Sequence, residues 1–156
     1  MNHSRRNALR AGGGAGVLAL LVAAGLVRPG DVLAADWNEA AFSVKTLPEA
    51  LRALGAQNPS ASDAIMIKAP EIAENGAVVP VAIESKLAGT QSIAILIEKN
   101  PQPLTASFDI PAGTEPNVAT RVKMGESSDV YALVKADGKF YFAKKEIKIT
   151  LGGCGG

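Results

Sequence analysis

The stretch that decides the fold runs from Val130 to Leu151 and reads VYALVKADGKFYFAKKEIKITL. Two runs in it, 130–135 and 139–143, are rich in Val, Phe and Tyr, and Asp137-Gly138 lies between them. An Asp-Gly pair between two strand-like runs is a strong hairpin signal, because these residues accept the positive φ angles of a tight turn. The stretch therefore predicts a β-hairpin. A further strand is expected over 146–151, where apolar and polar residues alternate.

Upstream of this hairpin, five more short runs have strand-like composition: 64–69, 78–85, 93–98, 104–110 and 118–123. Turn signals separate several of them, namely Asn75-Gly76, Asn100-Pro101 and Pro111-Ala112-Gly113. Short strands at this spacing are typical of an antiparallel β-sandwich. Pro80 lies inside one run and lacks a backbone N–H, so it predicts a sheet edge or a bulge there.

Short helices are expected before the strands. Asp36 and Thr46 each precede a glutamate by three residues, which is the spacing of a capping box. Gly55 follows a run with helical periodicity and is suited to end it. The large apolar residues of this region are expected to pack against one side of the sandwich rather than to bind a ligand: Trp37, Phe42, Leu47, Leu51 and Leu54. The predicted fold class is all-β, an antiparallel sandwich over residues 36–151 preceded by short N-terminal helices.

Residues 1–35 have the features of an export signal that is removed. Arg5-Arg6 begins a charged segment, an uncharged run follows over 11–27, and small residues end the segment at Ala34 and Ala35, either of which is a candidate cleavage point. The uncharged run is short and rich in glycine for a membrane span, so no stable membrane insertion is expected. The arginine pair resembles a twin-arginine signal, which exports folded proteins and predicts a periplasmic location.

Without residues 1–35, Lys and Arg fall from 16 to 12 and Asp and Glu from 15 to 14, which leaves a net charge of −2. This charge gives no basic footprint for nucleic acid. The only histidine, His3, is also lost. Catalysis that needs an imidazole base is therefore excluded, as are zinc and copper sites built from several His or Cys ligands. We expect no cofactor, no metal and no catalytic residue.

The only cysteine, Cys154, lies in the sequence Gly-Gly-Cys-Gly-Gly at 152–156. Glycine restricts the backbone least and adds no bulk, so Gly152, Gly153, Gly155 and Gly156 are expected to form a slender, flexible arm. No basic residue closer than Lys148 could lower the pKa of the thiol. The arm therefore offers access without activation. This combination indicates a carrier that presents a group on Cys154 to other proteins, rather than an enzyme.

The C-terminal sequence Ile149-Thr150-Leu151-Gly152-Gly153-Cys154-Gly155-Gly156 resembles that of the SoxY family, the sulfur-compound carriers of thiosulfate-oxidising Sox systems. The resemblance extends to the twin-arginine leader and to three internal segments, 72–81, 98–101 and 120–124, which look like scaffold and partner surface. It implies an immunoglobulin-like β-sandwich. It also implies that Cys154 is the point of covalent substrate attachment.

The resemblance further implies the partners. A SoxZ-like β-sandwich subunit would form a heterodimer with this chain, and higher oligomers could be disulfide-linked. A c-type cytochrome of the SoxXA type would couple thiosulfate to the thiol, and a hydrolase of the SoxB type would release sulfate and leave a persulfide. In organisms that have it, a sulfane dehydrogenase of the SoxCD type would oxidise the remaining sulfur.

Two alternatives remain open from the sequence. The chain could be an exported structural β-sandwich module that forms disulfide-linked dimers through Cys154, since a lone exported cysteine can pair between chains. Alternatively, Gly155-Gly156 could carry sulfur on the terminal carboxylate, as in ubiquitin-like carriers. That chemistry requires ATP-dependent activation in the cytoplasm, and the export signal argues against it.

Overall fold

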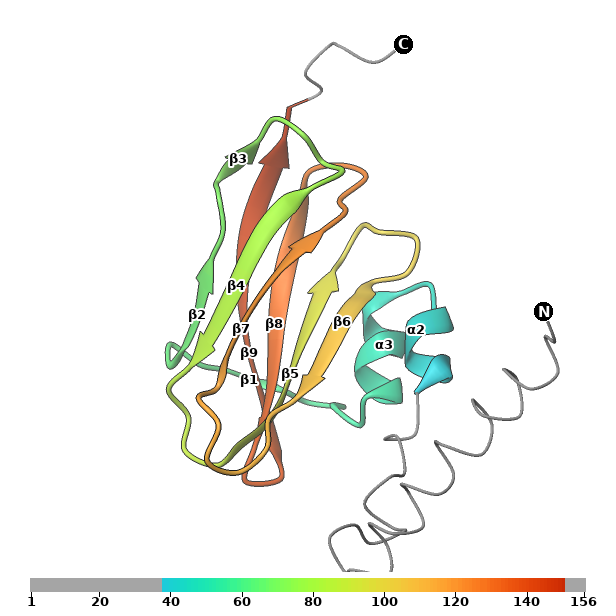
Figure 1. Ribbon diagram of the computed structural model, residues 1–156. Coiled ribbons are helices and arrows are strands. Elements are labelled where there is room, and N and C mark those ends of the chain that lie inside the picture. Colours follow the sequence, from blue (N-terminus) through green and yellow to red (C-terminus); the bar gives the residue numbers. More distant parts are fainter. Residues whose placement is uncertain (1–37, 151–156) are drawn as a thin grey trace, which may run out of the picture. The chain divides into compact units, whose positions relative to one another are not determined.

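The computed structural model describes residues 38–150, which fold into two short helices followed by nine strands (Figure 1). The elements are α2 (Glu39–Ser43), α3 (Leu47–Ala53), β1 (Ser60–Ala61), β2 (Ile65–Lys68), β3 (Ile72–Ala73), β4 (Val79–Ser85), β5 (Thr90–Ile97), β6 (Leu104–Asp109), β7 (Asn117–Val122), β8 (Ser128–Ala136) and β9 (Lys139–Ile149). One sheet has the order β1-β9-β8-β5-β6, with β3 also paired to β9, and the other has the order β2-β4-β7. The predicted all-β sandwich with N-terminal helices is confirmed.

The predicted hairpin is the contact between β8 and β9, which pair without interruption from Ser128↔Ile147 to Ala136↔Lys139. Asp137 and Gly138 form its turn with φ angles of 47° and 74°. One expectation was wrong. Residues 139–149 form one strand of 11 residues rather than two strands. The polar residues that interrupt the apolar pattern stay in the ladder because Lys144 pairs with Tyr131 of β8.

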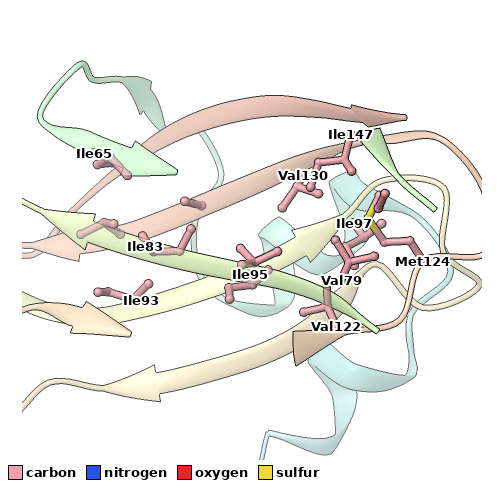
Figure 2. Close-up of a cluster of buried hydrophobic side chains, with 14 residues drawn as sticks. Ile65, Val79, Ile83, Ile93, Ile95, Ile97, Val122, Met124, Val130 and Ile147 are labelled. Carbon is pink, nitrogen blue, oxygen red and sulfur yellow. The ribbon is translucent and has the colours of Figure 1, made fainter. Parts of the chain in front are cut away.

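The main core lies between the two sheets and consists almost entirely of aliphatic side chains (Figure 2). Alternate residues of β4 and β7 meet alternate residues of β5, β8 and β9 there. The labelled members include Val79, Ile83, Ile95, Val130 and Ile147, and these five are completely or almost completely buried. Burial of such side chains stabilises the fold by roughly 1.5–3 kcal/mol each relative to exposure. Ile147 therefore fixes the C-terminal half of β9 to the core.

The helices cover part of the other face of the larger sheet. Ala41 and Ala50 are completely buried, and they pack in a second cluster with Leu96, Leu133 and neighbouring aromatic side chains. The expected packing of Phe42, Leu47, Leu51 and Leu54 against this side is confirmed, whereas Trp37 lies outside the described residues. No helix among residues 38–150 is long and apolar enough to cross a membrane.

The helix ends follow the sequence signals with one difference. Thr46 caps α3, with its N–H donating to the Glu49 carboxylate at 3.2 Å, and Gly55 follows the helix with a φ of 78°. The first described helix is capped by Asn38, whose side-chain oxygen accepts from the Ala41 N–H at 3.1 Å. Asp36, the expected cap, lies outside the described residues.

Pro80 occupies the middle strand of the smaller sheet, so the simple expectation of an edge strand was wrong. It pairs with Arg121 of β7 without a shift in register. On the other side of β4, however, β2 pairs only with residues from Ala82 to Ser85. Pro80 therefore has no neighbour from β2, and an edge exists locally at the proline.

Candidate functional site

The residues that the sequence singles out for chemistry lie outside the described part of the chain: Cys154 and the four glycines Gly152, Gly153, Gly155 and Gly156. Their roles as attachment point and flexible arm stay predictions. What the structure describes is the strand that carries them. It ends at Ile149, and Thr150 is the last described residue. The candidate site is therefore built from the contacts that hold the end of β9.

One side of β9 is held by the short strand β3, which runs parallel to it. Ile72 pairs with Lys148, and Ala73 pairs with Ile149. The Lys148 N–H donates to the Glu71 carbonyl at 2.9 Å, and the Thr150 N–H donates to the Ala73 carbonyl at 3.1 Å. The ladder thus continues to the last described residue.

The other side of β9 is held by the connection between β7 and β8. The Ser127 hydroxyl oxygen accepts a hydrogen bond from the Ile149 N–H at 2.9 Å. Ile147 is completely buried, and Ile149 packs against the same core. The expected inward face of the last strand is confirmed for these two residues, and Leu151 lies outside the described part. The origin of the predicted arm is consequently fixed on both sides.

Segments 71–78 and 123–127 flank this strand end, and a third loop, 98–101, is hydrogen-bonded to the second of them. Asn100 donates from its side chain to the Lys123 carbonyl at 2.8 Å and accepts from the Gly125 N–H at 3.3 Å. The Met124 N–H donates to the Gly76 carbonyl at 2.7 Å. We call the segments 71–78, 98–101 and 123–127 the exit rim. The first two coincide largely with internal segments that carried the sequence resemblance, and the third shares residues 123–124 with the last of those segments.

Gly76 lies too close to its neighbours to carry a side chain. A Cβ placed there would overlap the Met124 carbonyl oxygen and would lie 3.2 Å from Cγ2 of Ile149. The exit rim therefore packs directly on the last residue of β9. A substitution at this glycine should move the rim, the strand end or both.

Two titratable groups, one in the middle of β9 and one on the neighbouring strand β8, have raised pKa values. The Lys144 ammonium lies 2.7 Å from the Asp129 carboxylate, and this hydrogen bond raises the pKa of Lys144. Burial, followed by the nearby Glu98 carboxylate, raises the pKa of the Tyr131 phenol. Among residues 38–150, no three His, Cys, Asp or Glu side chains lie together as a metal site would require.

A family model described as sulfur oxidation protein SoxY matches residues 50–154. The chain belongs to the SoxY family. The matched span includes the whole sandwich and ends at Cys154. A search of curated proteins gives no match.

Solved structures agree with this assignment. The structure of the sulfur carrier protein SoxY from Chlorobium limicola f thiosulfatophilum is 41% identical, with a TM-score of 0.63, and the match covers 73% of this chain and 100% of that one. A superoxide reductase (neelaredoxin) from Ignicoccus hospitalis is 20% identical, with a TM-score of 0.50, and the match covers 55% of this chain and 80% of that one. At that identity the second likeness shows only a shared sandwich fold.

Sequence reasoning did not find the residues that hold the strand end. Ser127, Asn100 and Gly76 each make a contact that reaches across the chain to another loop or strand. Asn75-Gly76 and Asn100-Pro101 were recognised as turn signals, so the loops themselves were expected. The sequence carried no signal that these loops are joined to one another near the end of β9.

Proposed function

We propose that this SoxY-family chain is a covalent carrier of sulfur intermediates in thiosulfate oxidation, with the intermediates bound to Sγ of Cys154. The family match that extends to Cys154 carries this proposal. The similar Chlorobium limicola protein is described as a sulfur carrier, which supports the same role. The anchored end of β9 adds a physical reason, because it gives the arm a fixed origin.

Loading joins thiosulfate to the thiol. The Cys154 thiolate and thiosulfate form a sulfur–sulfur bond and give the S-thiosulfonate Cys–S–S–SO₃⁻, with the loss of two electrons. A c-type cytochrome of the SoxXA type accepts these electrons. The chain's own contribution is to present an unobstructed thiol. The glycines on either side of Cys154 suit this role because they add no side chains to the arm.

Release then takes place in steps on separate enzymes. A hydrolase of the SoxB type adds water to the terminal sulfonate, which releases sulfate and two protons and leaves the persulfide Cys–S–S⁻. Where a sulfane dehydrogenase of the SoxCD type is present, it takes six electrons from the outer sulfur and, with three waters, forms Cys–S–SO₃⁻. A second hydrolysis releases sulfate and restores the thiol. The carrier itself is not catalytic in this scheme.

The length of the arm sets how close these enzymes must come. Four Cα–Cα steps lead from Thr150 to Cys154, a distance of at most about 14 Å when the chain is extended. The sandwich, with a SoxZ-like subunit bound to it, therefore stays at the mouth of each active site while the arm enters. We assign activation of the thiol to the enzyme, because no basic residue closer than Lys148 lies near Cys154 in the sequence.

The decisive experiment replaces Sγ of Cys154, the atom to which the intermediates would bind, by oxygen. Cys154→Ser should abolish thiosulfate-dependent respiration while the fold and the heterodimer remain intact. Thr150→Ala is the matched control, because it changes an exposed side chain at the start of the arm and keeps the thiol. Normal activity of the serine variant would refute the carrier role. It would leave the structural dimer as the better explanation of Cys154.

Intact mass spectrometry of protein from thiosulfate-grown cells gives a second, independent readout. The carrier role predicts additions of one sulfur or of a thiosulfate group on Cys154 that a reductant removes. An adduct on the C-terminal carboxylate would instead indicate ubiquitin-like chemistry. A disulfide dimer as the sole modified form would favour the structural module.

We further propose that the chain acts in the periplasm after export in folded form by the twin-arginine route. The Arg5-Arg6 pair supports this location. Co-export of a folded heterodimer would explain why a chain without expected cofactors uses that route. Replacing Arg5 and Arg6 by lysines should then leave both subunits in the cytoplasm. Periplasmic accumulation of the partner subunit in that strain would contradict co-export.

A further inference from the structure

Two of the three large apolar side chains that the described residues expose lie in the exit rim. Ile72 is 58% exposed and Val78 is 51% exposed, whereas the third, Met66, is 36% exposed and lies on β2. Scattered apolar residues on a surface are ordinary and need no explanation. Two such residues in the segment that flanks the end of β9, where the predicted arm begins, are less easily explained by chance.

Both side chains are placed by the same segment that holds β9. Ile72 belongs to β3 and pairs with Lys148, so it lies beside the last residues of β9. Val78 follows the turn at Asn75, whose carbonyl accepts the Val78 N–H at 3.3 Å. Gly76 lies in that turn and packs on Ile149 and Met124. The two side chains are therefore presented on a backbone that is hydrogen-bonded to the rest of the exit rim.

We propose that the exit rim, with Ile72 and Val78 as its apolar contacts, is the surface on which the enzymes that act on Cys154 dock. This inference rests on the proposed carrier function. The expected partner is an enzyme whose active site lies in a channel narrow enough to receive the arm. The proposal requires that the subunit that forms the heterodimer occupies a different surface.

The length of the arm supports docking of such an enzyme at the exit rim. Cys154 can reach at most about 14 Å from Thr150, and part of that length is needed inside the channel. The mouth of the channel must therefore come close to Thr150. Because two segments of the exit rim flank the strand at that point, an enzyme that encloses the thiol comes into contact with the rim.

The charges of the rim favour apolar contact over electrostatic attraction. Its segments contain four glutamates and two lysines, with Lys148 of β9 beside them: Glu71, Glu74, Glu98, Glu126, Lys99 and Lys123. Lys99 and Glu126 approach within 3.9 Å, but both are largely exposed, and such pairs contribute little. A surface of mixed charge does not select strongly for partners of one sign. Exposed apolar side chains therefore supply the contact that several different enzymes can share.

The test uses the sulfate-releasing hydrolase of the same organism and the exported chain with its partner subunit bound. Tetrathionate loads the thiol directly: the Cys154 thiolate attacks an inner sulfur, Cys–S–S–SO₃⁻ forms, and thiosulfate leaves. We compare Ile72→Ser, Val78→Ser and the double variant with Met66→Ser. Met66 is the matched control, because it is also exposed but pairs with Glu84 near the far end of β4 from the rim.

The double variant should lower kcat/KM for sulfate release by about tenfold, as expected when apolar residues central to an interface are truncated. Each single variant should lower it by less, and Met66→Ser should leave it within about twofold. The rate of loading by tetrathionate should be the same in all four, because a small reagent does not need the rim. The thermal midpoint of each variant should also be unchanged, since both rim side chains are exposed.

An unchanged kcat/KM in the double variant would overturn the proposal, as would an equal loss in Met66→Ser. Loss of the partner subunit from the double variant would also overturn it, because the rim would then belong to the heterodimer interface. If the wild-type loaded chain released no sulfate at all, the carrier function itself would be refuted, and the docking rim with it.

Discussion

Gly76→Ala tests whether the exit rim holds the end of β9 as tightly as the structure indicates. The new Cβ would overlap the Met124 carbonyl oxygen, which is backbone and cannot move alone, and would lie 3.2 Å from Cγ2 of Ile149. Removing this overlap requires the loop to shift. The same shift also strains the 2.7 Å hydrogen bond from the Met124 N–H to the Gly76 carbonyl. Overpacking of this kind typically costs about 1–3 kcal/mol.

For a domain of this size, that cost corresponds to a fall in the thermal midpoint of roughly 4–12 °C. Urea unfolding followed by circular dichroism measures it directly, and an unchanged slope would show that only the folded state is affected. Gly125→Ala is the control, because Gly125 lies in the same rim and a Cβ there meets nothing within 4 Å. Equal stability of the two variants would refute the close approach of the rim to β9.

Three further predictions concern hydrogen bonding, titration and turn geometry. Ser127→Ala removes the acceptor of the Ile149 N–H, so amide exchange at Ile149 should accelerate and stability should fall by about 1 kcal/mol. Because burial raises the pKa of Tyr131, the folded state holds that proton more tightly than the unfolded state, and stability should decline as pH rises above about 10. Tyr131→Phe should remove this part of the decline when thermal midpoints at pH 9 and pH 11 are compared. Gly138→Ala, at a φ of 74°, should destabilise the hairpin by about 1 kcal/mol in urea titrations.

The parts of the fold that the sequence predicted are those with local causes. Asp137-Gly138 specified the turn between β8 and β9, since few other pairs accept positive φ at both positions. Thr46 and Gly55 marked the ends of α3 through capping. Alternation placed Ile147 on the inward face. Each of these inferences needed only residues within a few positions of one another.

The parts that were missed depend on distant pairing. β1 and β3 have two residues each, which is too short to show any periodicity, and they exist because they lie in parallel register beside β9. The division of residues 139–149 into two strands failed for a related reason. Lys144 and Lys145 interrupt the apolar pattern, but continuous pairing with β8 keeps them in one strand.

The candidate site also has a part that the sequence predicted and a part that it did not. Composition alone singled out Cys154 and its glycines, because four glycines around the only thiol form an unusual pattern. The network that holds their origin could not be predicted, since Ser127 and Ile149 are 22 positions apart and Asn100 and Lys123 are 23 apart. Such contacts are fixed by the arrangement of the sheets and not by any local sequence preference.

The anchored strand end matters for the proposed carrier because it sets the length of the predicted arm. A flexible tether keeps its end group at a high local concentration when its length matches the distance to be spanned, and this concentration falls as the tether lengthens. If the bonds from Thr150 to Ala73 and from Ile149 to Ser127 were absent, β9 could fray, and each freed residue would add up to about 3.5 Å of tether. Cys154 would then sample a larger volume, and an enzyme docked on the exit rim would meet it less often. In the proposed mechanism, pairing that continues to Thr150 thus keeps the reach of Cys154 short enough for an enzyme to dock on the rim and receive the thiol at the same time.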